Sequence, residues 1–173
     1  MPLVFQYGSN TSSKRLNSDE RLEGDANSLG LARTVENFEL TFSHLSKRNK
    51  CATAHLQSGV GRKIFGVFYD ISEDRVFRNK GGQKKTLDEI EGEGKEYCRT
   101  KISVVLVKDP GESFPACTYL VKGPKNSVET NTSYVGYIIA GLREHCAPLE
   151  YIEYVKRQAV SNNPSLEPEV QNM

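Results

Sequence analysis

The spacing of apolar residues predicts a series of short strands before any long helix. Ile64–Ile71 is almost continuously apolar and aromatic, so we expect a central strand there, and Gly66 within it indicates a close backbone approach. Asp109-Pro110-Gly111 is a turn pattern, which predicts that the strands on either side form a hairpin. The segments with strand patterns are Val4-Phe5, Phe38–Phe42, Cys51–Leu56, Ile64–Ile71, Ile102–Val107 and Phe114–Lys122.

Helical spacing dominates only the last third of the chain. Tyr134, Ile138, Leu142 and Cys146 fall on one helical face. A second helix is expected to open at Pro148, with Tyr151, Ile152 and Val155 as its apolar stripe. A shorter helix is expected around Lys84–Glu91, after the break at Gly81-Gly82, and the polar tail 161–173 is expected to be disordered. These elements predict one α+β domain over residues 1–160, a small mixed β-barrel flanked by helices.

Composition and charge narrow the classes of function. The 173 residues carry 23 basic and 22 acidic side chains, and this balance argues against a nucleic-acid partner. The basic run Lys47–Lys50 has no interleaved aromatic residues, which favours a solvated loop. No apolar run approaches the ~18 residues of a membrane span, and the first residues do not resemble a secretory signal. We therefore expect a cytoplasmic protein with no membrane partner.

The cysteines and histidines are scattered along the chain. None of the four cysteines lies in a CxxC pair, and the three histidines show no spacing typical of metal ligands. The sequence therefore predicts no metal site.

The first candidate for chemistry is the stretch Tyr7-Gly8-Ser9-Asn10. It follows the Val4-Phe5 strand and is made of residues that favour a tight turn. Thr11, Ser12 or Ser13 can then cap a helix. Backbone N–H groups at such a strand–loop–helix junction suit a carboxylate or an oxyanion. An ordinary turn is the alternative interpretation of the local sequence.

The second candidate is Leu87-Asp88-Glu89-Ile90-Glu91-Gly92. We expect these acids at the end of a helix that Gly92 closes, with Leu87 and Ile90 facing the core. Glu91 then lies at the edge of the buried surface, where its pKa is raised toward the value that suits a general acid/base. A solvated acidic helix end is the alternative.

Together with later blocks, these two stretches resemble the γ-glutamylcyclotransferase family. Tyr97 follows the second stretch, Thr118-Tyr119-Leu120 comes next, and Tyr134–His145 precedes Pro148-Leu149-Glu150-Tyr151-Ile152. The order of these blocks, rather than any one of them, carries the resemblance, which extends over roughly residues 3–157.

The resemblance implies cyclisation of a γ-glutamyl amide to 5-oxoproline without a cofactor. It implies a small-molecule partner with a γ-glutamyl group and leaves a homodimer open. Glu91 would be the catalytic acid/base, and Tyr7, Gly8, Ser9 and Asn10 would form the substrate loop. Tyr97, Tyr119 and Tyr134 match tyrosines of the family's pocket. The leaving group stays open between an amino acid, an amine and a γ-glutamyl-capped biosynthetic intermediate.

Two functions of other classes compete with this one. A non-catalytic module on the same fold would bind a small molecule or carboxylate, although an acid at Glu91 disfavours a carboxylate ligand. A hydrolase would use Ser9 or a cysteine as its nucleophile. Gly8-Ser9-Asn10 is not a G-x-S-x-G elbow, and no cysteine has an evident histidine partner.

Overall fold

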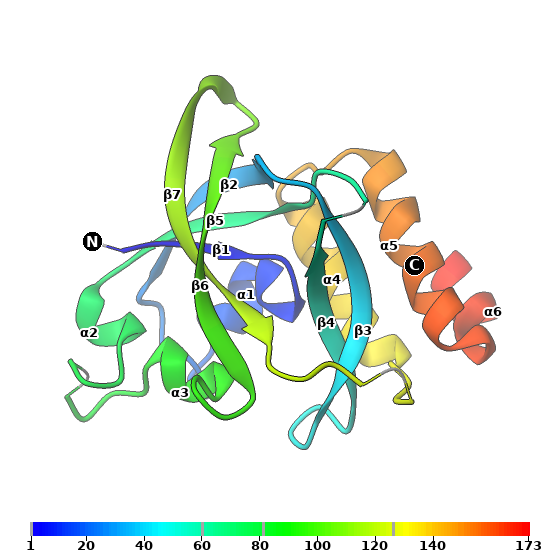
Figure 1. Cartoon of the computed structure of the whole chain (residues 1–173), viewed down its shortest axis with the longest axis horizontal. Coiled ribbons are helices and arrows are strands. Elements are labelled where there is room, and N and C mark those ends of the chain that lie inside the picture. The colour runs from blue at the N-terminus through cyan, green and yellow to red at the C-terminus, as the bar shows by residue number, and fades with distance from the viewer. Residues whose placement is uncertain (1, 60, 81, 126) are drawn as a thin grey trace.

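A five-stranded barrel forms the centre of the protein (Figure 1). The structure, a computed structural model, describes residues 2–59, 61–80, 82–125 and 127–173. The strands close in the order β1-β5-β2-β6-β7, with β1 and β7 parallel at Val4 and Cys117 and the other pairs antiparallel. Their bounds are β1 Leu3–Gln6, β2 Ala26–Thr34, β5 Phe65–Ile71, β6 Tyr97–Leu106 and β7 Asp109–Val121. The predicted α+β barrel flanked by helices is confirmed.

Two local predictions about the barrel are also confirmed. β5 lies between β1 and β2, and a Cβ atom on Gly66 would stand 2.4 Å from the carbonyl oxygen of Gln6. Only glycine permits that approach, because real Cβ atoms do not come so close to a backbone oxygen. β6 and β7 form the expected antiparallel hairpin. The turn, however, lies at Val107-Lys108, and the predicted turn residues Asp109-Pro110-Gly111 belong to β7.

Strands β3 (Phe38–Ser46) and β4 (Cys51–Ser58) form a separate two-stranded sheet. The long helices α4 (Thr132–Glu144) and α5 (Leu149–Asn162) bury most of the apolar faces that the sequence predicts. Cys146 is the exception, because α4 ends before it and its side chain is exposed. The side chain of Gln158 on α5 donates to the carbonyl oxygen of Leu40 on β3 over 2.6 Å. This bond ties α5 to the β3–β4 hairpin. The hairpin therefore completes the core between the barrel and the C-terminal helices (Figure 1).

Four short helical elements connect the strands: η1 Ser9–Thr11, α1 Ser13–Leu16, α2 Glu73–Val76 and α3 Leu87–Glu91. The prediction that a helix spans Lys84–Glu91 is too long, because Thr86 caps α3 with its side chain and helical structure starts one residue later. Asp88 and Glu89 thus lie in the first turn of α3 rather than at its end. There, their negative charges interact favourably with the helix dipole. Gly81 of the expected break lies outside the described residues.

The tail is ordered, so the expectation of disorder over residues 161–173 is wrong. A turn, η2 (Pro164–Leu166), leads into α6 (Glu167–Gln171). Leu166 and Val170, four residues apart, are buried in the main core, and Asn163 caps the turn with its side chain. Two apolar residues at helical spacing outweigh the polar composition of this segment.

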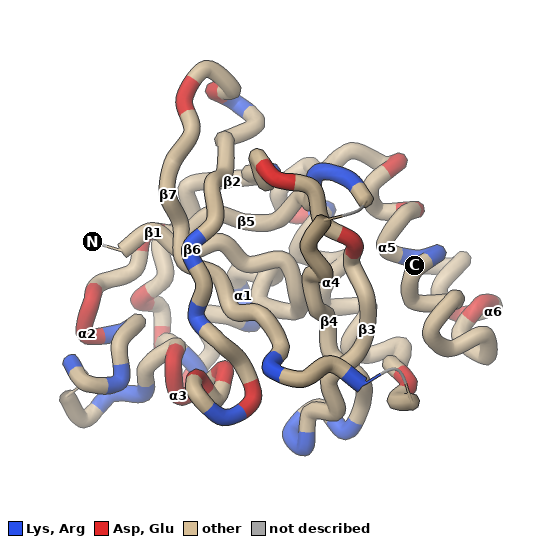
Figure 2. Tube along the Cα trace, viewed as in Figure 1, with Lys and Arg blue, Asp and Glu red and all other residues tan. Residues whose placement is uncertain are grey.

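Charged residues of both signs are interspersed along the chain (Figure 2). Across the described ranges, every helix is too short or too polar to cross a bilayer.

Candidate active site

All eight residues singled out from the sequence line one cavity. They are Tyr7, Gly8, Ser9, Asn10, Glu91, Tyr97, Tyr119 and Tyr134, and Gln6 and Ala54 complete the lining. The end of β1, the last residue of α3, the start of β6, the end of β7 and the start of α4 meet here. An outer cavity of about 180 Å³ shares Ser9, Asn10, Glu91, Tyr97 and Tyr134 with it.

Close packing fixes the loop that follows β1. A Cβ atom on Gly141 of α4 would stand 2.2 Å from the carbonyl carbon of Thr11, so the loop lies directly on that helix. The Tyr69 hydroxyl lies 3.3 Å from the carbonyl oxygens of Asn10 and Thr11. A Cβ atom on Gly8 would stand 3.0 Å from the Tyr134 hydroxyl. A larger residue than glycine would therefore push into the cavity.

Glu91 contributes a carboxyl group to the lining of the cavity. Gly92 ends α3 in the left-handed conformation, with φ 65°, as the sequence predicts. Asn10 donates its side-chain N–H to Glu91 Oε1 over 2.6 Å. Burial raises the pKa of Glu91, while Arg21 and the hydrogen bond from Asn10 lower it. The carboxyl group is thus held in place with a pKa shifted toward neutral, as acid/base chemistry requires.

Arg21 is the counter-charge of this carboxyl group, and sequence reasoning missed it. Its side chain is buried, and Nη1 donates to Asn10 Oδ1 over 2.9 Å. Burial and the neighbouring Arg15 lower the pKa of Arg21 to about 10, so it stays charged at neutral pH. Arg21 comes from a polar stretch before β2 that contains no motif, and only the fold brings it to the cavity.

The four tyrosines mostly bond to the protein itself. Tyr7 donates its hydroxyl proton to the carbonyl oxygen of Tyr119 over 2.6 Å. The Tyr97 hydroxyl pairs with Thr53 Oγ1 at 2.6 Å, and Tyr134 Oη accepts from the backbone N–H of Ala54 at 3.1 Å. Their ring packing therefore defines the walls, whereas Asn10 is the residue that orients Glu91.

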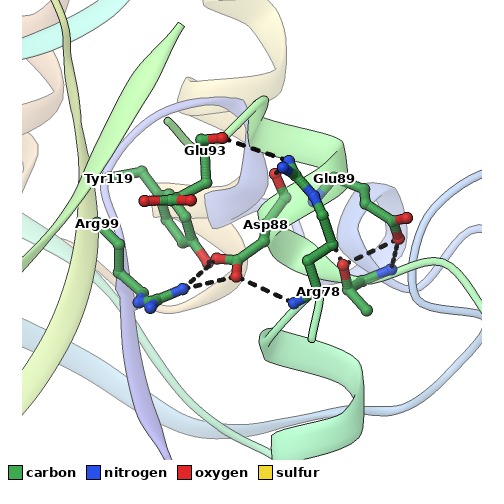
Figure 3. Close-up of polar contacts among 7 residues, drawn as sticks. Arg78, Asp88, Glu89, Glu93, Arg99 and Tyr119 are labelled. Atoms are coloured by element: carbon green, nitrogen blue, oxygen red, sulfur yellow. Dashed lines mark hydrogen bonds and ion pairs between the residues drawn. The ribbon is translucent and has the colours of Figure 1, made fainter. Parts of the chain in front are cut away.

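Asp88 anchors the helix that carries Glu91 (Figure 3). Its buried carboxylate lies 2.6 Å from Arg99 Nη1 and accepts the hydroxyl proton of Tyr119 over 2.7 Å. It also accepts from the backbone N–H of Arg78 over 3.1 Å. One side chain thus ties α3 to β6, to β7 and to the segment after α2.

The turn between β3 and β4 forms the rim of the outer cavity. The sequence favoured a solvated loop at Lys47–Lys50, but Lys47, Arg48 and Asn49 line the cavity beside Arg21. Figure 2 shows the basic positions at this turn. Arg48 pairs with Glu20 at 3.0 Å and is partly exposed. The rim is therefore more positive than the chain as a whole.

Other chemistries find little support in the described parts of the chain. Neither a histidine nor a cysteine lines either cavity there. No group of three or more His, Cys, Asp and Glu side chains in these ranges is arranged to hold a metal ion. A Ser9 nucleophile would thus lack a histidine base at this site.

A sequence model of the family described as "Gamma-glutamyl cyclotransferase, AIG2-like" matches residues 4–137, a range that includes every residue of the candidate site named above. The chain belongs to this family. No curated protein matches the chain. The family assignment therefore rests on the sequence model and covers most of the chain.

Solved structures share the fold of this γ-glutamyl cyclotransferase family member. One described as "Gamma-glutamyl cyclotransferase" is 24% identical, with a TM-score of 0.74, over 90% of this chain and 86% of its own. An uncharacterised protein from Homo sapiens is 25% identical, with a TM-score of 0.73, over 89% and 85%. YkqA from Bacillus subtilis is 20% identical, with a TM-score of 0.73, over 92% of this chain and 54% of its own.

Proposed function

We propose that this protein converts a γ-glutamyl amide into 5-oxoproline and a free amine or amino acid. The observation that carries the proposal is the Glu91 carboxyl group, which Asn10 holds in a cavity and whose pKa burial raises. Family membership supports the same reaction. The cavity lacks a cysteine or histidine in the described residues, and this reaction needs neither, because the substrate supplies its own nucleophile.

In the proposed step, the α-nitrogen of the γ-glutamyl unit attacks its own γ-carbonyl carbon. Ionised Glu91 takes a proton from the α-ammonium group, so that the nitrogen lone pair can form the new C–N bond. The γ-amide C–N bond then breaks, and protonated Glu91 gives its proton to the leaving nitrogen. The ring nitrogen loses its second proton to become the neutral lactam N–H, and the released amine takes up this proton and leaves as an ammonium ion. The products are 5-oxoproline and the amine, and the carboxylate is restored. Such acid/base work contributes about 10²–10⁴-fold to a rate.

The remaining site residues position the substrate in this proposal. The backbone of Gly8, Ser9 and Asn10 supplies N–H donors for the carbonyl oxygen as it becomes negative. Tyr97, Tyr119 and Tyr134 enclose the γ-glutamyl chain and hold it folded, so that its two ends meet.

Incubation with a panel of γ-glutamyl amino acids and γ-glutamyl amines tests the reaction. We expect 5-oxoproline and the free leaving group to appear in equal amounts, measured by mass spectrometry. A protein that binds members of the panel in a thermal-shift assay but forms no product would be a binding module. That result would refute the proposed reaction.

A further inference from the structure

Gln6, the last residue of β1, is a buried polar side chain without an assigned role. It is 6% exposed, and its amide Nε2 has no hydrogen-bond partner among the described residues. A buried donor without a partner loses its bonds to water and gains none in return. Each such group requires an explanation, such as a water molecule or a ligand. Several buried polar atoms among the described residues lack a partner, and Gln6 is the one of these residues that lines the cavity.

The strand register places the Gln6 side chain on the same face of β1 as Val4. Side chains of a strand alternate between its two faces, so Gln6 shares a face with Val4, and its cross-strand partner on β5 is Val67. Val4 and Val67 pack in the core cluster that contains Tyr97 and Tyr119. Gln6 itself lines the cavity with these tyrosines and Glu91.

The other side chains that might donate to a substrate carbonyl mostly have protein acceptors. The hydroxyl protons of Tyr7 and Tyr119 go to the Tyr119 carbonyl oxygen and to Asp88. Tyr97 pairs with Thr53, and the Asn10 amide donates to Glu91. Within the described lining, the hydroxyl groups of Ser9 and Tyr134 also donate to no protein acceptor, and Gln6 is the side-chain amide that the protein leaves unused.

We propose that Gln6 Nε2 donates a hydrogen bond to the γ-carbonyl oxygen of the substrate and stabilises the oxyanion that forms there. The inference rests on the proposed function, because it assigns a donor to the cyclisation step. Gln6 is then a catalytic residue that acts with the backbone N–H groups of the following loop. The unpaired amide is the structural cost of a donor prepared for the transition state.

Two substitutions test this role. Gln6→Met keeps the length of the side chain and removes the donor, and Gln6→Glu keeps the shape and replaces the donor with an acceptor. We expect Gln6→Met to lower kcat by about 10²–10³-fold, as removal of one oxyanion donor does, with a smaller change in KM. Gln6→Glu should be no more active than Gln6→Met, because a carboxylate cannot donate a hydrogen bond. The matched control is Gln57→Met on an exposed part of β4, which should leave kcat unchanged.

The melting temperature separates a catalytic from a structural role. Because the amide lacks a partner, Gln6→Met should melt at the same or a higher temperature than the wild type. A lower melting temperature would show that the amide supports the fold and would overturn the inference. A wild-type kcat in Gln6→Met would also overturn it. A wild-type kcat in Gln6→Glu would overturn it too, because it would show that Gln6 acts as an acceptor for the substrate ammonium group and not as a donor.

The outcome for the wild-type protein distinguishes this inference from the proposed function. Wild-type turnover with an equally active Gln6→Met variant rejects the role of Gln6 alone. If the wild-type protein forms no 5-oxoproline from any substrate, both the cyclisation and the role of Gln6 are rejected. If Gln6→Met does not fold, Gln6→Leu removes the same donor in its place.

Discussion

Replacement of Asp88 by asparagine tests whether this carboxylate anchors α3. Asn keeps the shape but offers one oxygen where Asp offers two, so either the Tyr119 hydroxyl or the Arg78 N–H loses its acceptor. The pair with Arg99 also loses its charge, although the Arg99 side chain is 31% exposed and can partly return to water.

The expected loss of stability follows from these contacts. One lost hydrogen bond to a charged acceptor costs about 1.5–3 kcal/mol, and removal of one partner from a buried ion pair costs about 3–5 kcal/mol. Because Arg99 is partly hydrated, we expect a decrease of about 3 kcal/mol in the free energy of unfolding. For a chain of this length, that lowers Tm by roughly 6–12 °C.

Urea and thermal unfolding of Asp88→Asn measure this effect, with Glu93→Gln as the matched control. Glu93 lies in the same segment, and its carboxylate makes no hydrogen bond to the described residues (Figure 3). The control should change the free energy of unfolding by no more than about 0.5 kcal/mol. An equally small change in Asp88→Asn would refute the anchoring role.

Three further predictions concern the cavity. Burial raises the pKa of Glu91 above its ordinary 4.5, so its ionisation costs folded-state stability as the pH rises above that value. Glu91→Gln should therefore melt above the wild type at pH 7, with a smaller difference at pH 4, and a difference independent of pH would contradict this sign. Arg21→Met removes a charge that lowers the pKa of Glu91, so the acidic limb of the kcat profile should move to higher pH; an unmoved limb argues against this coupling. Gly8→Val forces a side chain against the Tyr134 hydroxyl and should abolish substrate binding, and unchanged KM and kcat would refute the role of the loop.

Local patterns were sufficient to predict the elements whose apolar faces are continuous. The run Ile64–Ile71 and the apolar stripe of α5 each bury a regular set of side chains. The start of β2 at Ala26 and the helix α6 have mostly polar sequences, so their patterns are weak. Their structure depends on partners far away in the chain, which a local pattern does not contain.

The sequence also predicted only part of the candidate site. Resemblance and local chemistry singled out Glu91 and the Tyr7–Asn10 loop, and both line one cavity. Arg21 belongs to no motif, and Gln6 lies within the Val4–Asn10 stretch but carries no local signal of a role. Arg21 is linked to the site by its hydrogen bond to Asn10, and Gln6 is distinguished by a buried amide without a hydrogen-bond partner. Both facts depend on tertiary packing rather than on sequence spacing.

The kcat of Glu91→Gln on the best γ-glutamyl substrate is the most direct test of the central claim. Glutamine keeps the shape of the side chain but cannot accept the proton of the α-ammonium group. We predict a folded variant whose rate of 5-oxoproline formation is at least about 10²-fold lower than that of the wild type. A folded variant that turns over at the wild-type rate would show that Glu91 does not carry the proton.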